Sequence, residues 1–186
     1  MNCQIKQGNI NKEDTEVLVL GSYEDDKTLP KNFQVLDKAL GGQLQELRKS
    51  GEFIGKNQQS VLIHTRGIVP AKRILFMGLG KKKEVTLDSI RQAMGSASKK
   101  ARQTGAQTCS ALIMGTEALN SSASEIAQAM VEGAILGNYR FNYYRSDNAD
   151  STKNIRSITL LANSANEVDA IKTGARRGEA LSLIHI

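Results

Sequence analysis

The sequence predicts a single α/β domain whose sheet, mainly parallel or mixed, is flanked by helices. Short apolar runs of strand character alternate with segments of helical periodicity, which is typical of a layered α/β fold. The run 17–20 is apolar at every position, as in a strand that is buried on both faces. A length of 186 residues, with 40% hydrophobic and 24% charged residues, suits one globular core.

The first half of the chain contains strands and short helices. Strand character recurs in four runs, at 3–7, 15–20, 61–65 and 73–78. The last two of these runs are joined by a tight connection, so we expect one antiparallel or closely connected pair. The segment 21–30 is polar and predicts a surface loop. Apolar residues at helical spacing over 33–47, interrupted by Gly41 and Gly42, predict one kinked helix or two short ones, ending at Gly51.

The second half contains two helices with recognisable start signals. Thr86 can cap the helix that follows it, and Asp88 is favourable in the first turn of that helix. Ser122 and Glu125 have the spacing of a capping box ahead of the next helix. The remaining predictions are strands at 108–114 and 157–161, a polar loop or linker at 147–153, and helical character from 165 onward.

The segment 132–146 holds half of the chain's tyrosines and phenylalanines. Gly133 lies on the apolar side of the predicted helix, where a missing side chain lets another backbone approach, and Gly137 can end the helix in a left-handed turn. Both glycines are expected to permit close packing. Tyr139 and Phe141 alternate along the extended peptide that follows and are expected to fill the packing around it. The segment either anchors the helix or docks onto another domain or subunit, and the residues leave both interpretations open.

A glycine-rich turn is the candidate phosphate site. Gly78, Gly80 and Lys81 follow an apolar strand and precede a helix, where backbone amides and lysines can surround a phosphate. Neither the dinucleotide fingerprint nor the Walker spacing is met. The alternative is an ordinary turn with solvated lysines.

Basic residues give the chain a formal net charge of +6, which permits attraction to nucleic acid. No helix-turn-helix, RNA-binding or zinc-finger pattern accompanies them, so solvated faces are the competing interpretation. The residues concerned are Lys72, Arg73, Lys81, Lys82, Lys83, Lys99, Lys100, Arg102, Arg176 and Arg177.

The sequence predicts no catalytic and no metal-binding residue. His64 lies in a candidate strand and His185 lies in the terminal tail, without clustered ligands or a catalytic triad. Cys3 and Cys109 lie in candidate strands without CxxC spacing, which indicates reduced thiols. No apolar run approaches the roughly 20 residues of a membrane helix, and the N-terminus lacks the apolar stretch of a signal peptide, so we expect a cytoplasmic protein.

Three segments together resemble the N-terminal domain of the leucyl (cytosol) aminopeptidases, peptidase family M17. They are 51–56, 73–81 and 132–141, and their order and spacing fit the family over roughly residues 1–182. The residues that mark the third segment are Glu132, Gly133, Gly137, Tyr139 and Phe141. The resemblance implies a macro-domain-like fold over 1–162 and the start of a linker helix over 163–186. The last residues, 183–186, depart from the family pattern, and we expect truncation or a foreign tail there.

The resemblance also implies a function. Complete members remove N-terminal amino acids from peptides with two divalent metals, zinc, manganese or magnesium, held by a C-terminal domain, and they form hexamers. Those metal ligands have no counterpart here, so the resemblance implies a non-catalytic domain without a cofactor, whose partners are its own catalytic domain and the other subunits. Two alternatives stay open: a free-standing module that binds a phosphate-bearing ligand through 78–83, and an accessory domain that binds nucleic acid.

Overall fold

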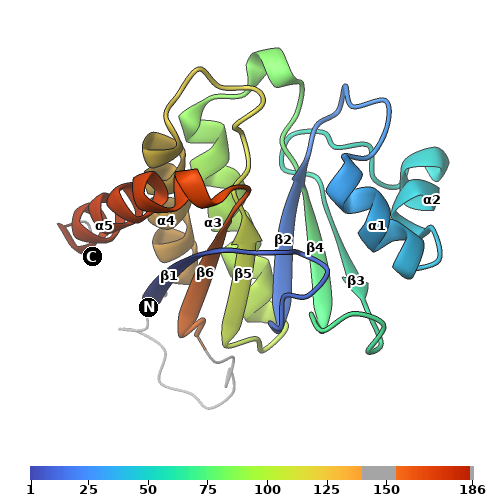
Figure 1. Ribbon diagram of the computed structural model, residues 1–186, viewed down its shortest axis with the longest axis horizontal. Helices are drawn as coiled ribbons and strands as arrows, with labels where there is room; N and C mark the ends of the chain where they lie inside the picture. The colour runs from blue at the N-terminus through green and yellow to red at the C-terminus, as the bar shows by residue number, and fades with distance from the viewer. Residues whose placement is uncertain (140–153, 185–186) are drawn as a thin grey trace, which may run out of the picture.

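The computed structural model describes residues 1–139 and 154–184 and consists of a sheet with helices on both faces (Figure 1). Within these residues the sheet has six strands in the order β1-β6-β5-β2-β4-β3. β3 runs antiparallel to β4, and every other neighbouring pair is parallel, which confirms the predicted sheet. The strands are β1 (Asn2–Gln7), β2 (Val17–Ser22), β3 (Ser60–His64), β4 (Arg73–Gly78), β5 (Thr108–Leu112) and β6 (Ser157–Ala162).

The helices divide the core into two halves, one on each face of the sheet. Leu18 and Leu20 of β2 pack with α1 and α2 on one face, whereas Val17 and Val19 pack with α3, α4 and α5 on the other. The apolar run of β2 is therefore buried on both sides, as predicted. The helices are α1 (Lys31–Ala39), α2 (Gln43–Ser50), α3 (Leu87–Gln103), α4 (Ala123–Asn138) and α5 (Val168–Ile184), with short 3-10 turns η1 (Lys82–Glu84) and η2 (Ala165–Glu167).

The predicted helix signals are confirmed. The Thr86 side chain accepts a hydrogen bond from the third residue of α3. At the start of α4, the Ser122 side chain accepts from the Glu125 amide at 3.2 Å, and the Glu125 carboxylate accepts from the Ser122 amide at 2.9 Å. Gly41 and Gly42, both with positive φ, separate α1 from α2, so the predicted helical segment is two short helices.

Several predicted boundaries are wrong by one or two residues, and two of them concern the ends of β2 and β5. The loop expected over 21–30 begins later, because Gly21 and Ser22 continue β2 and pair with β4. The strand expected over 108–114 ends at Leu112, although the next two residues remain buried. Both errors arise because neighbouring strands, rather than local residue type, decide where pairing begins and ends.

For Gly137 the predicted left-handed helix end is wrong, whereas the predicted close packing is confirmed. α4 continues to Asn138, and Gly137 keeps a negative φ, so it does not end the helix in a left-handed turn. A Cβ atom at this position would lie 2.2 Å from the carbonyl oxygen of Gly95 on α3. The glycine is therefore needed for close helix packing.

Candidate functional site

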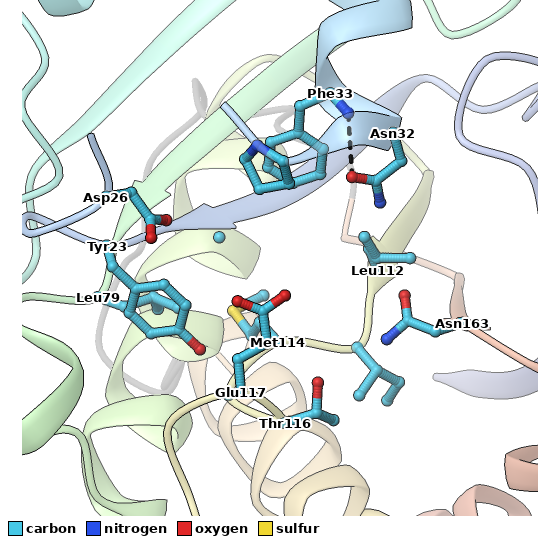
Figure 2. Close-up of a pocket in the computed structure, with 14 residues that line it drawn as sticks. Tyr23, Asp26, Asn32, Phe33, Leu79, Leu112, Met114, Thr116, Glu117 and Asn163 are labelled. Atoms are coloured by element: carbon cyan, nitrogen blue, oxygen red, sulfur yellow. Dashed lines mark hydrogen bonds between the residues drawn. The ribbon is translucent and has the colours of Figure 1, made fainter. Parts of the chain in front are cut away.

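The carboxyl ends of β2 and β5 border a cleft. The chain leaves β2 toward α1 on one face of the sheet and leaves β5 toward α4 on the other, so the connections diverge between these neighbouring parallel strands. Ligands of open α/β sheets bind at such a topological switch point. Figure 2 shows the cleft, whose apolar lining includes Phe33, Leu79, Leu112 and Met114.

Polar side chains converge on the same cleft. Asp26, Asn32, Thr116, Glu117 and Asn163 line it, and both ionisable carboxylates among them point into it (Figure 2). The cavity volume is about 70 Å³. Pockets for drug-sized ligands or cofactors are usually several-fold larger, so this cleft suits a small group rather than a nucleotide.

The Lys82 ammonium group lies between the two carboxylates. Its Nζ atom is 2.9 Å from Asp26 Oδ1 and 3.4 Å from Glu117 Oε2, and it lies 5.0 Å from the centroid of the Tyr23 ring. The hydrogen bond with Asp26 raises the pKa of Lys82. Burial raises the pKa of Tyr23 to about 12, and the nearby Glu117 carboxylate acts in the same direction. At neutral pH the ammonium is therefore charged and the phenol is neutral.

Arg48 fixes the loop that carries Asp26. Its guanidinium donates hydrogen bonds to Ser22 Oγ at 2.6 Å and to the carbonyl oxygens of Tyr23 and Asp26 at 3.3 and 2.5 Å. The backbone that carries Asp26 is thus held in place from the α2 side before any ligand arrives.

Sequence reasoning missed this cleft. Asp26, Lys82 and Glu117 lie far apart in the chain and come together only because β2, β4 and β5 are neighbouring parallel strands. The one sequence signal that could have indicated the cleft is the position of two glycines. Gly21 and Gly115 accompany the ends of two apolar strands, but the strand order had to be known before these ends could be placed side by side.

The candidate phosphate site has little free donor capacity. The Gly78 amide donates to the carbonyl oxygen of Gln59 at 2.7 Å, and the Gly80 amide donates to that of Gly55 at 3.0 Å. Lys81 is exposed, and the next element is the short turn η1 rather than the start of α3. A bound phosphate would have to replace existing backbone hydrogen bonds. Phosphate binding stays a prediction that this geometry does not favour.

Several residues of the proposed basic surface are engaged within the protein. Arg102 is buried and donates to the carbonyl oxygen of Asn138 at 2.7 Å. Lys72 pairs with Glu16 at 3.3 Å, and Lys82 points to the cleft acids. Nucleic-acid binding likewise stays a prediction.

The described part of segment 132–146, residues 132–139, lies where α4 packs against α3. Arg91 Nε is 2.8 Å from the Glu132 carboxylate, and a Cβ at Gly133 would lie 2.1 Å from the carbonyl oxygen of Arg91. Close approach at Gly133 is confirmed. Tyr139, however, is 45% exposed, so the expectation that it fills the packing is wrong. Phe141 lies outside the described residues.

Residues 1–139 and 154–184 contain no group of three or more His, Cys, Asp or Glu side chains placed to hold a metal ion. His64 is exposed at the end of β3. Cys3 and Cys109 are free thiols, and burial raises the pKa of each to about 12. His185 lies outside the described part of the chain. None of the helices in that part has the length and apolar character needed to span a membrane.

The sequence is similar to known aminopeptidases. The model of the "Cytosol aminopeptidase family, N-terminal domain" matches residues 19–148. A probable cytosol aminopeptidase of Alkaliphilus metalliredigens is 30% identical over 183 residues, which cover 98% of this chain and 36% of that protein. One of Geobacter sp. is 35% identical over 162 residues, covering 87% of this chain and 32% of that protein. The chain thus spans about a third of the length of these curated relatives.

Solved structures share the fold at lower identity. A mutant tomato leucine aminopeptidase matches with a TM-score of 0.80 and 23% identity, over 98% of this chain and 36% of that one. A macrodomain of Oceanobacillus iheyensis matches with a TM-score of 0.68 and 13% identity, over 98% of this chain and 93% of that one. The fold is therefore macrodomain-like, as the resemblance to the aminopeptidase domain implied.

Proposed function

The chain belongs to the cytosol aminopeptidase family, of which it provides the N-terminal domain, and on that premise we propose that it is a non-catalytic, architectural domain of a longer metallo-aminopeptidase. The observation that carries this proposal is the extent of the match. Nearly the whole chain aligns, yet it corresponds to only 36% of one relative's length. We assign peptide hydrolysis to the part of the relatives that lies outside this alignment.

The chemistry of the described residues supports the same division. Two-metal hydrolysis needs clustered ligands that hold both ions and generate a hydroxide nucleophile. The described residues do not provide such a cluster, and the two carboxylates that converge on the cleft are both paired with Lys82. The described residues therefore do not fit a two-metal centre, and we derive no hydrolytic step from them.

In this proposal α5 is the start of the linker helix, and it begins inside this domain. Ile171 and Ala175 are buried in the core beside α4. A Cβ at Gly174 would lie 1.9 Å from the carbonyl oxygen of Ser124, so the two helices pack with their backbones close together. A helix anchored this firmly would hold a following domain in a defined orientation.

The finer parts of the proposal come from the family alone. They are divalent zinc, manganese or magnesium bound by the catalytic domain, peptide substrates, a homo-hexamer whose access this domain restricts, and a cytoplasmic location. Each concerns the longer protein rather than the described residues.

An assay with leucyl-p-nitroanilide tests the proposal. The purified 186-residue chain, supplied with manganese or zinc, should release no nitroaniline above the metal-only blank, whereas a polypeptide that continues into a metallopeptidase domain should hydrolyse the substrate. Metal-dependent turnover by the 186-residue chain, abolished by EDTA, would show that the assignment as non-catalytic is wrong.

A further inference from the structure

We propose that the cleft at the ends of β2 and β5 binds a small organic cation that carries a primary ammonium group, and that the Lys82 side chain occupies the ammonium position in the present structure. The inference does not rest on the function proposed above. It rests on the groups that surround Lys82 Nζ: the carboxylates of Asp26 and Glu117 and the face of the Tyr23 ring. Carboxylates and an aromatic face are the groups that recognise an ammonium ion in proteins.

Asp26 retains capacity for a further donor. Its Oδ1 atom pairs with Lys82, but its Oδ2 atom is buried and has no hydrogen-bond partner within the described residues. A buried carboxylate oxygen without a donor is costly, and a ligand N–H group would remove that cost. The side chain is 11% exposed and lines the cleft (Figure 2), so the Asp26 carboxylate borders the space that a ligand would enter.

The charge of the site selects a cation over an anion. The lining carboxylates of Asp26 and Glu117, together with the adjacent Lys82, carry one formal net negative charge. The other polar side chains of the lining are neutral: Tyr23, Asn32, Thr116 and Asn163. A phosphate would face two carboxylates, and the repulsion would come mainly from Asp26, which is 11% exposed, because Glu117 is 63% exposed and screened by water. This chain should therefore reject phosphate compounds at the switch point of its sheet.

Lys82 can leave the site without disturbing the fold. Its side chain is 37% exposed and lies on the three-residue turn η1, whereas Asp26 is held from the other side by Arg48. An incoming ammonium group would replace the tethered one, and Lys82 would move into solvent. A tethered group competes at a local concentration in about the millimolar range, so the unmodified protein should bind the ligand weakly.

NMR titration of the ¹⁵N-labelled chain with propylammonium chloride tests the proposal. We expect saturable shifts at the amides around Tyr23, Asp26 and Met114, with a Kd in roughly the millimolar range for the unmodified chain. Lys82→Met should bind at least about tenfold more tightly because the internal competitor is gone. Asp26→Asn should abolish the saturable shifts both in the otherwise unmodified chain and in the Lys82→Met variant.

Matched controls separate recognition from general effects. Lys83→Met, an exposed neighbour in the same turn, should leave the Kd unchanged. Propanol, which lacks the charge, and inorganic phosphate should cause no saturable shift at these amides. The proposal is wrong if propylammonium gives no saturable shift with either the unmodified chain or Lys82→Met, if propanol shifts the same amides equally, or if Lys82→Met binds no more tightly than the unmodified chain.

Discussion

Glu132 connects two helices through a charged pair at the edge of the core. Its side chain is 12% exposed and accepts hydrogen bonds from Arg91 Nε at 2.8 Å and from Gln128 Nε2 at 2.9 Å. Glu132→Gln keeps the shape of the side chain but removes the charge that Arg91 faces. We expect a loss of about 1–2 kcal/mol in the free energy of unfolding, measured by urea denaturation, as for hydrogen bonds to charged groups.

Asp88 provides the matched control because it pairs with the same arginine. The distance from Arg91 Nη1 to Asp88 is 2.9 Å, but Asp88 is 64% exposed. Asp88→Asn should change the free energy of unfolding by less than about 0.5 kcal/mol, since exposed pairs contribute little. Equal losses of unfolding free energy in the two variants would mean that the burial of Glu132 does not strengthen its ion pair with Arg91.

Glu16 makes stability depend on pH. Its carboxylate accepts from the Gln107 amide at 2.6 Å and the Thr108 amide at 3.2 Å, and the Gln107 bond is the main cause of its lowered pKa. Because the folded pKa lies below the unfolded value, the stabilisation is fully present above the unfolded pKa and is lost as pH falls through the folded one.

The corresponding variant is Glu16→Gln. The difference in unfolding free energy between the unmodified chain and this variant should be largest near pH 7 and should shrink below about pH 4.5, which is the ordinary range of a glutamate pKa. Urea midpoints at pH 7, 5, 4 and 3 measure it. A difference that stayed constant across this range would contradict the proposed role of the Glu16 carboxylate.

At the scale of elements, α3 and α4 pack closely because glycines remove the side chains between them. A Cβ at Gly133 or Gly137 would lie 2.1 or 2.2 Å from a carbonyl oxygen of α3, whereas one at Gly95 would lie 3.2 Å from the Gly133 oxygen. Gly133→Ala and Gly137→Ala should each lower the free energy of unfolding by about 1–3 kcal/mol, because the helices must separate.

Gly95→Ala is the internal control for this series. The neighbouring backbone needs to move only a few tenths of an ångström, and alanine favours a helix over glycine by up to about 1 kcal/mol. Its urea midpoint should therefore remain close to that of the unmodified chain. Equal urea midpoints for all three variants would show that these glycines are not needed for the close packing of α3 on α4.

Some features of these elements could be predicted because their causes are local. Thr86 and Ser122 were identified as helix starts from residue type and spacing, and both form the expected capping bonds. The residues around Gly137 predict both a helix end and close packing, and only the packing is found, because a glycine near a helix end serves equally as a terminator or as a contact point. Only the neighbouring Gly95 on another helix decides between these uses, and one sequence does not state which helices touch.

At the scale of the whole molecule, the fold class could be predicted and the cleft could not. The alternation of strands and helices gave the layered arrangement, and the fully apolar β2 indicated burial on both faces. Asp26, Lys82 and Glu117 meet only after the chain has crossed from one side of β2 to the other. A site made by strand order has no signature in a short stretch of residues.

The central claim, that this chain is one domain of a longer aminopeptidase, is tested most directly by the size of the polypeptide that carries it. An antibody raised against residues 1–139 should detect, in a denaturing gel of the producing cells, a polypeptide much larger than 20.2 kDa, since the aligned 183 residues make up only 36% of one relative. Detection of a product at 20.2 kDa alone would contradict the account and favour a free-standing module.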